Sequence, residues 1–465
     1  MAGWYQRAKQ CAAITALAIG IGAPASSETL REAMVSAYKE SGLLEQNRAL
    51  LRAADEDVAV AAAALRPIIG YTASLSRDFG DSATQGRFTS HESSAGLSAD
   101  LLLFDGGSSR LNTEAQKEVV LATRESLRAL EQEVILRGVV AYMDVRLRQA
   151  VVSLRENNLR LITQELRAAR DRFEVGEVTR TDVALAESRL AASRSQLAAA
   201  QGDYVRAQEE YANVIGHQPG TLAPVSPANT GVSSVAEAKA IARRTHPELE
   251  AAKHEITAAE INVARAQAAL KPSLNLEGRY GITRDLDTGD EGRSGSVGLN
   301  LSGPIYRGGE LSARTRQATA RRDAERASLI TVQRNVDQEV GNAFATLSVV
   351  RASREASVEQ VRAAQVAFEG LREEATLGAR TTLEVLDAEQ ELLDARFELV
   401  SSEVDQIISS YQLLAAMGRL TVDALNLPVQ RYDPAAYYNL VKDAPVAVSR
   451  QGRALDRVLK SLNPN

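Results

Sequence analysis

The side chains best suited to chemistry lie within residues 378–387. Glu384 and Asp387 are three residues apart, so on a helix their carboxylates share one face. Carboxylates held close together repel one another, raise some of their pKa values and attract cations. A structural alternative exists for both residues. Glu384 could cap a helix, and Asp387 could lie on a solvated helix face.

Catalytic and metal-binding motifs are missing from the rest of the sequence. It contains no H-E-x-x-H, G-x-S-x-G, P-loop or dinucleotide-binding pattern. The histidines lack zinc-ligand spacing: His91, His217, His246 and His254. A net charge of −6 argues against a nucleic-acid partner. We therefore expect a protein that is not an enzyme, with no metal site and no cofactor.

One motif, G-x-x-T-x-x-[DE], occurs twice, at 176–182 and 378–384. Each copy has a glycine suited to the left-handed conformation past a helix end, and a threonine suited to capping the next helix: Gly176 with Thr179, and Gly378 with Thr381. An acid three residues after each threonine completes a capping box. The motif therefore predicts two helical hairpins with tips at 175–182 and 377–387.

Other landmarks also occur twice, in the same order. Ala64-Leu65-Arg66-Pro67 matches Ala269-Leu270-Lys271-Pro272, and Gly106-Gly107 matches Gly308-Gly309. These matches predict a tandem duplication with structural repeats at 28–222 and 233–425. Each repeat is expected to hold one helix, two strands, a very long helix, a tip and a returning helix.

Four segments alternate between apolar and polar residues, at about 68–78, 93–104, 273–283 and 294–306. This alternation is typical of transmembrane barrel strands, although a half-buried soluble hairpin alternates too. Four strands cannot close a barrel, and lipid does not tolerate open edges. The membrane interpretation therefore requires an oligomer, and a trimer would share a 12-stranded barrel.

The helices between these strands and the tips are unusually long. Residues 108–174 and 309–376 contain only isolated glycines as breakers, so each helix could extend on the order of 100 Å. The returning helix has a heptad seam from Val183 to Val214. This seam indicates a left-handed coiled coil, either around a conduit or as an ordinary antiparallel coil without a pore.

The two chain ends lie outside the repeats. Residues 1–25 have basic residues, a small-apolar run and Ala23-Pro24-Ala25, as in a secretory signal peptide. Cys11, the only cysteine, falls in this segment, and no later stretch is apolar enough for a transmembrane helix. The tail 426–465 is rich in proline and has a basic, helical-looking segment at 449–462. The sequence leaves open whether the tail wraps the helices or is disordered.

These features together resemble the TolC family of outer-membrane channel proteins. The most specific match is residues 378–388, G-A-R-T-T-L-E-V-L-D-A, against the family's G-x-R-T-x-x-D-V-L-D-A. The resemblance covers about 28–425. It implies an α+β membrane protein: a homotrimer with a shared 12-stranded β-barrel in the outer membrane and a long α-helical barrel of coiled-coil hairpins, with most of the mass in the periplasm.

The resemblance also implies a function and partners. It predicts the exit duct of a tripartite export system, passing proteins or small toxic compounds. The partners would be a periplasmic adaptor (membrane fusion) protein, an inner-membrane ABC or proton-driven transporter, and outer-membrane lipid. Because no lipoprotein cysteine is present, type I secretion is favoured over acylated efflux components.

The resemblance assigns a gate to the tips. Glu384 and Asp387 match two acids that ring the periplasmic entrance, where three copies would place six carboxylates. Arg380 matches the arginine of a closing latch, whose partners would be Thr181 and Asp182 on the other hairpin.

One latch residue differs from the family pattern. Ala375 stands where the family prototype has a tyrosine, and this difference predicts a weaker latch than in that prototype.

A second hypothesis remains, a periplasmic coiled-coil scaffold or adaptor without a membrane pore. The four alternating segments in two matched pairs favour the channel. The sequence does not identify the cargo.

Overall fold

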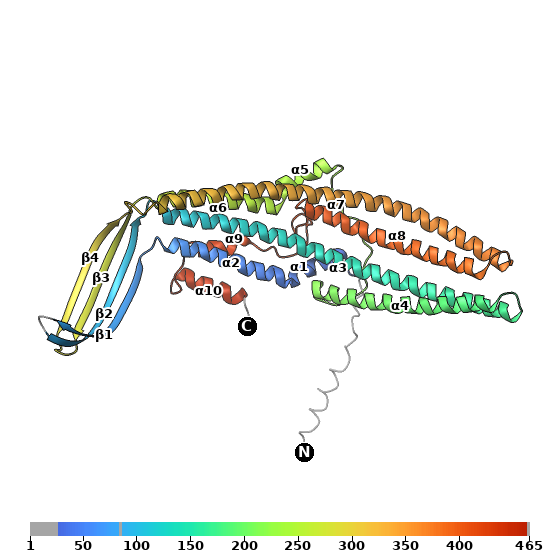
Figure 1. Ribbon diagram of the computed structural model, residues 1–465, viewed down its shortest axis with the longest axis horizontal. Coiled ribbons are helices and arrows are strands. Elements are labelled where there is room, and N and C mark those ends of the chain that lie inside the picture. The colour runs from blue at the N-terminus through green and yellow to red at the C-terminus, as the bar shows by residue number, and fades with distance from the viewer. Residues whose placement is uncertain (1–26, 83–85, 463–465) are drawn as a thin grey trace, which may run out of the picture. The chain divides into compact units, whose positions relative to one another are not determined.

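The computed structural model describes residues 27–82 and 86–462 (Figure 1). The predicted signal peptide at 1–25, with Cys11, lies outside these ranges. The chain divides into two compact units. The hairpin unit contains the described part of Met1–Glu40 with Arg137–Ala228 and Val350–Ile408, and the sheet unit contains Ser41–Leu136, Asn229–Val349 and the described part of Ser409–Asn465.

The sheet unit holds one antiparallel sheet of four strands in the order β1-β2-β3-β4 (Figure 1). The strands are β1 Ile68–Ser82, β2 Gly86–Phe104, β3 Ser273–Asp285 and β4 Glu291–Ser302. They contain the four alternating segments of the sequence, but β1 ends four residues later and β2 begins seven residues earlier than expected. β4 ends four residues earlier than expected, because Pro304 has no N–H to donate to a strand ladder.

The register of the sheet gathers its apolar side chains on one face. Tyr71 pairs with Leu97, and Leu97 pairs in turn with Tyr280. Directly paired residues of antiparallel strands point to the same side, so these three side chains form one row. The apolar residues of this face are largely exposed, as Leu75 at 74% and Val297 at 83% illustrate. The chain by itself therefore leaves this apolar face uncovered.

Two very long helices follow the strand pairs. Helix α3 runs from Ser108 to Glu174 and α7 from Glu310 to Thr376, each 67 residues long. Each is followed by a returning helix, α4 Arg180–Ile215 or α8 Thr382–Ala416. The long helices end within a residue of their predicted limits, because glycine and capping threonine mark the tips.

The helix that precedes each strand pair is in fact two helices, so the prediction of a single helix was wrong. The breaks are at Ser41 and His246, and the helices are α1 Leu30–Glu40, α2 Gly42–Ala63, α5 Val235–Thr245 and α6 Pro247–Ala268. Ser41 is extended and its hydroxyl accepts a hydrogen bond from the Leu44 amide. His246 is also extended, because the ring of Pro247 disfavours the helical conformation of the residue before it. The element order of the second half repeats that of the first, while the repeat limits 28–222 and 233–425 stay a prediction.

The described part of the C-terminal tail belongs to the sheet unit. It forms α9 Pro434–Val441 and α10 Arg450–Leu462. The Tyr437 hydroxyl lies 2.7 Å from a carboxylate oxygen of Glu56 in α2, and the Arg124 guanidinium lies 5.2 Å from the centre of the Tyr438 ring. Arg124 also lies 3.7 Å from the buried Asp55, whose pKa is raised to about 6 by its removal from water. None of the described helices combines the length and apolar character that a membrane-crossing helix needs.

Candidate gate at the hairpin tips

The first tip turns through Gly176 and Thr179. Gly176 has a φ of 80°, which a residue with a Cβ adopts only under strain. The Thr179 hydroxyl accepts a hydrogen bond from the Asp182 amide at 3.3 Å, and the Asp182 carboxylate accepts one from the Thr179 amide at 2.8 Å. These two bonds form a reciprocal capping box. The Thr179 hydroxyl also donates to the Asp182 carboxylate at 2.7 Å, and this bond, with that from the Thr179 amide, holds the pKa of Asp182 below its usual value.

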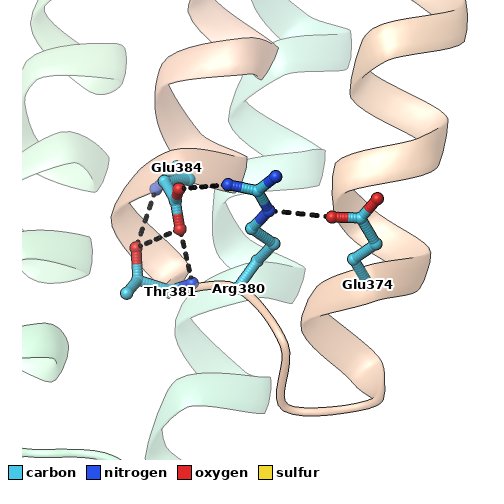
Figure 2. Close-up of polar contacts among 4 residues, drawn as sticks. All are labelled: Glu374, Arg380, Thr381 and Glu384. Carbon is cyan, nitrogen blue, oxygen red and sulfur yellow. Dashed lines mark hydrogen bonds and ion pairs between the residues drawn. The ribbon is translucent and has the colours of Figure 1, made fainter.

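The second tip has the same geometry. Gly378 has a φ of 75°, and the Ala379 amide donates to the Glu374 carbonyl at 3.0 Å. The Glu384 carboxylate accepts hydrogen bonds from the Thr381 amide at 2.8 Å and from the Thr381 hydroxyl at 3.0 Å (Figure 2). These bonds and the nearby Arg380 lower the pKa of Glu384. Glu384 is therefore a capping residue and an ionised carboxylate at the same time.

Arg380 is the residue that distinguishes the second tip from the first. Its Nε donates to Glu374 at 2.8 Å and its terminal nitrogen donates to Glu384 at 3.0 Å (Figure 2). Glu374 belongs to α7 and Glu384 to α8, so the guanidinium bridges the two helices of its own hairpin. The Arg380 side chain remains 45% exposed, which leaves room for a further contact.

The predicted latch is not formed within this chain. Among the described residues, Arg380 pairs with Glu374 and Glu384, and the carboxylate of Asp182 bonds Thr179. Contact of Arg380 with Thr181 and Asp182 therefore stays a prediction. Ala375, at the position of the family prototype's tyrosine, is buried in the core of the second hairpin with Phe368 and Val385.

Asp387, the second acid of the predicted ring, has a partner that the sequence did not predict. Asp387 Oδ1 lies 2.7 Å from a terminal nitrogen of Arg189, which belongs to α4 in the first hairpin. Arg189 lies seven residues after Asp182, so both residues share a face of α4. That spacing could have indicated that Arg189 faces the same side of the hairpin as the tip acid.

A buried polar cluster behind the tips was also missed. The Asn158 amide donates to Glu389 at 2.9 Å, and the Ser193 hydroxyl donates to Asn158 at 2.9 Å. Only 3% of Glu389 is exposed, and this burial raises its pKa to about 7, aided by Glu165 and opposed by Arg372. The cluster joins α8 to both helices of the first hairpin.

Comparison with known proteins assigns the chain to a family. The family described as "Outer membrane efflux protein" matches residues 34–217 and 240–419. Outer membrane efflux protein BepC of Brucella suis is 38% identical over 94% of this chain and 97% of its own length. The chain belongs to the TolC family of outer membrane efflux proteins. Alkaline protease secretion protein AprF of Pseudomonas aeruginosa is 27% identical over 79% of this chain and 80% of its own length.

The fold of this TolC-family protein is shared with solved channels. The crystal structure of the CmeC outer membrane channel of Campylobacter jejuni superimposes with a TM-score of 0.75, at 18% identity, over 89% of each chain. Family and fold confirm the predicted resemblance to the TolC family and the helix-rich fold with four antiparallel strands. They also confirm the predicted location in the outer membrane, with a large periplasmic helical part.

The described residues of this TolC-family protein were also compared with the requirements of a metal site. Among residues 27–82 and 86–462, no group of three or more histidine, cysteine, aspartate or glutamate side chains is arranged to hold a metal ion. Members of the family are channels. What the tip residues supply is fixed charge, helix capping and contacts between helices.

Proposed function

We propose that the protein is the exit duct of a tripartite export system, a homotrimer whose copies share one outer-membrane barrel and one periplasmic helical conduit. The observation that supports this most strongly is the sheet. Its apolar face is exposed, and among the described residues β1 and β4 each have one unpaired edge. Lipid would cover the apolar face, and strands of neighbouring copies would pair with the edges.

The topology allows such closure. With four antiparallel strands, β1 and β4 run in opposite directions, so β4 of one copy can pair antiparallel with β1 of the next. Three copies would complete a 12-stranded barrel. The opposite face of the sheet carries small and polar residues, such as Ser74 paired with Ser94 and Asp100 paired with Glu277, which suit a water-filled interior.

The gate in this proposal is the ring of tips. Glu384 and Asp387 from three copies would surround the periplasmic entrance, where their charge favours cations. Arg380, Thr181 and Asp182 would act in closing it.

The partners and the cargo class follow from the same proposal. A periplasmic adaptor and an inner-membrane ABC or proton-driven transporter would deliver cargo to the tips. We favour protein secretion of type I, because the only cysteine is Cys11 within the predicted signal peptide, and because the relative AprF is named for alkaline protease secretion. Drug efflux is the alternative, and the relative BepC is named as an efflux protein.

Fractionation of cells tests the duct. We expect the protein in the outer-membrane fraction, migrating as a trimer in unheated detergent gels and as a monomer after boiling. Recovery only from the soluble periplasm would contradict the proposal and favour the scaffold or adaptor.

Deletion of the gene tests the cargo. Loss of specific proteins from the culture medium, with unchanged drug sensitivity, would support type I secretion. The reverse pattern would contradict it and support efflux of small compounds.

A further inference from the structure

The ion pair between Arg189 and Asp387 joins the two hairpins of one chain. Arg189 comes from α4 and Asp387 from α8, with 2.7 Å between nitrogen and oxygen. Each helix is the returning arm of its hairpin, and Asp387 lies three residues beyond Glu384. The pair therefore lies at the proposed gate and links its two halves within a protomer.

Packing on both sides of Asp387 fixes the position of this contact. Leu386 is only 1% exposed and packs among residues of the first hairpin, including Ile162, Ala186 and Leu190. Two residues after Asp387, Glu389 is bonded to Asn158. Because α8 is anchored against α3 and α4 immediately before and shortly after Asp387, the Asp387 carboxylate is directed toward Arg189 by buried contacts rather than by the exposed pair alone.

This arrangement changes the charge of the proposed ring. Glu384 is matched by Arg380, and Asp387 is matched by Arg189. While α4 and α8 are in register, both ring carboxylates are paired with arginines of the same chain. An unpaired Asp387 would appear only if α8 moved away from α4.

We propose that Arg189 is a specificity-determining residue, which sets the ion preference of the entrance by pairing with Asp387 within each protomer. This inference rests on the proposed channel function. The pair would keep α4 and α8 of one protomer aligned. Separation of the two helices would leave Asp387 unpaired and so increase the negative charge at the channel entrance.

Ion selectivity in planar bilayers tests the charge effect. R189Q is expected to raise the cation-to-anion permeability ratio about twofold or more, because it exposes one carboxylate per copy. R189Q combined with D387N is expected to return the ratio to the wild-type value. The matched control is R170Q, which makes the same charge change by breaking the 2.5 Å pair with Glu187 inside the first hairpin. A ratio for R189Q no higher than that for R170Q would overturn the proposal.

Cross-linking tests the contact independently of conduction. Cys11 is the only natural cysteine, so R189C with D387C can be joined selectively by a short bis-thiol reagent. The expected product is a linked peptide within one chain, with monomer mass after boiling. A ladder of dimers and trimers would show contact between chains and overturn the proposal. A wild-type protein that conducts no ions would contradict the channel function, and the cross-link would still decide the Arg189 contact.

Discussion

At the scale of single residues, the second tip is a set of paired charges. Arg380 bonds Glu374 and Glu384, and Arg189 bonds Asp387. All of these side chains are substantially exposed, and exposed ion pairs contribute little to stability. Their effect at the tip is on net charge and on the alignment of helices.

Replacement of Arg380 tests its part in closure. Arg380→Ser leaves Glu374 and Glu384 without the bridging guanidinium, so the two helices of the second hairpin repel and the tip loosens. We expect a larger resting conductance in single-channel recordings. Arg362→Ser, which breaks an exposed pair with Glu359 within α7, is the matched control. A tightly closed Arg380→Ser channel would count against the latch.

Two glycines at the ends of the returning helices give a matched stability test. Gly216 and Gly418 have φ values of 93° and 71°, so alanine costs roughly 1 kcal/mol at either position. A Cβ on Gly418 would lie 2.8 Å from the Thr245 carbonyl and from the His246 Cα, which are backbone atoms. A Cβ on Gly216 would lie 2.8 Å from the flexible side chain of Glu40.

We therefore expect Gly418→Ala to lower the thermal unfolding midpoint more than Gly216→Ala does. The Glu40 side chain can move aside, whereas the backbone at His246 cannot. Equal midpoints for the two variants would show that the backbone at His246 adjusts freely.

At the scale of elements, local sequence signals predicted the hairpins well. The long helices lack breakers, and the tip glycines and threonines mark where they end. The same rules missed the breaks at Ser41 and His246, although Pro247 was a visible signal for the second. The breaks went unrecognised because helical periodicity continues across both positions.

The contacts between hairpins could not be predicted from the sequence. Arg189 and Asp387 are far apart in the chain, as are Asn158 and Glu389. Neither pair has a local motif, and each depends on the packing of α8 against the first hairpin. The resemblance to a family supplied Glu384 and Asp387, but it did not supply their partners in this chain.

The buried Glu389 predicts a pH dependence of helix packing. Its pKa of about 7 lies above the ordinary 4.5, so the stabilisation from its protonated form is complete below about 4.5 and is lost as the pH rises through about 7. The loss is at most about 3 kcal/mol. Hydrogen-exchange protection of α8 should therefore fall between pH 5 and pH 8.

The variant Glu389→Gln should remove this dependence, because a neutral amide of the same shape can keep the bond to Asn158. Glu391→Gln, an exposed change on the same helix, is the control and should leave the dependence in place. Equal pH dependence in wild type and Glu389→Gln would contradict the role of Glu389.

At the scale of the whole molecule, the alternating segments predicted a sheet, and the register shows that their apolar residues share one exposed face. That face and the two unpaired strand edges are the physical reasons for expecting lipid and further copies of the chain. Membership of the TolC family agrees with both. The fold of the tail depends on contacts of α9 with α2. No local sequence pattern predicted these contacts.

Ion selectivity of the purified protein in planar bilayers tests the central claim most directly. The account predicts cation-selective channels, and a lower cation-to-anion permeability ratio when Glu384→Gln and Asp387→Asn are combined, because the entrance then loses two carboxylates per copy while Arg380 and Arg189 keep their positive charge. A wild-type protein without channel activity, or a double variant with unchanged ion preference, would contradict it.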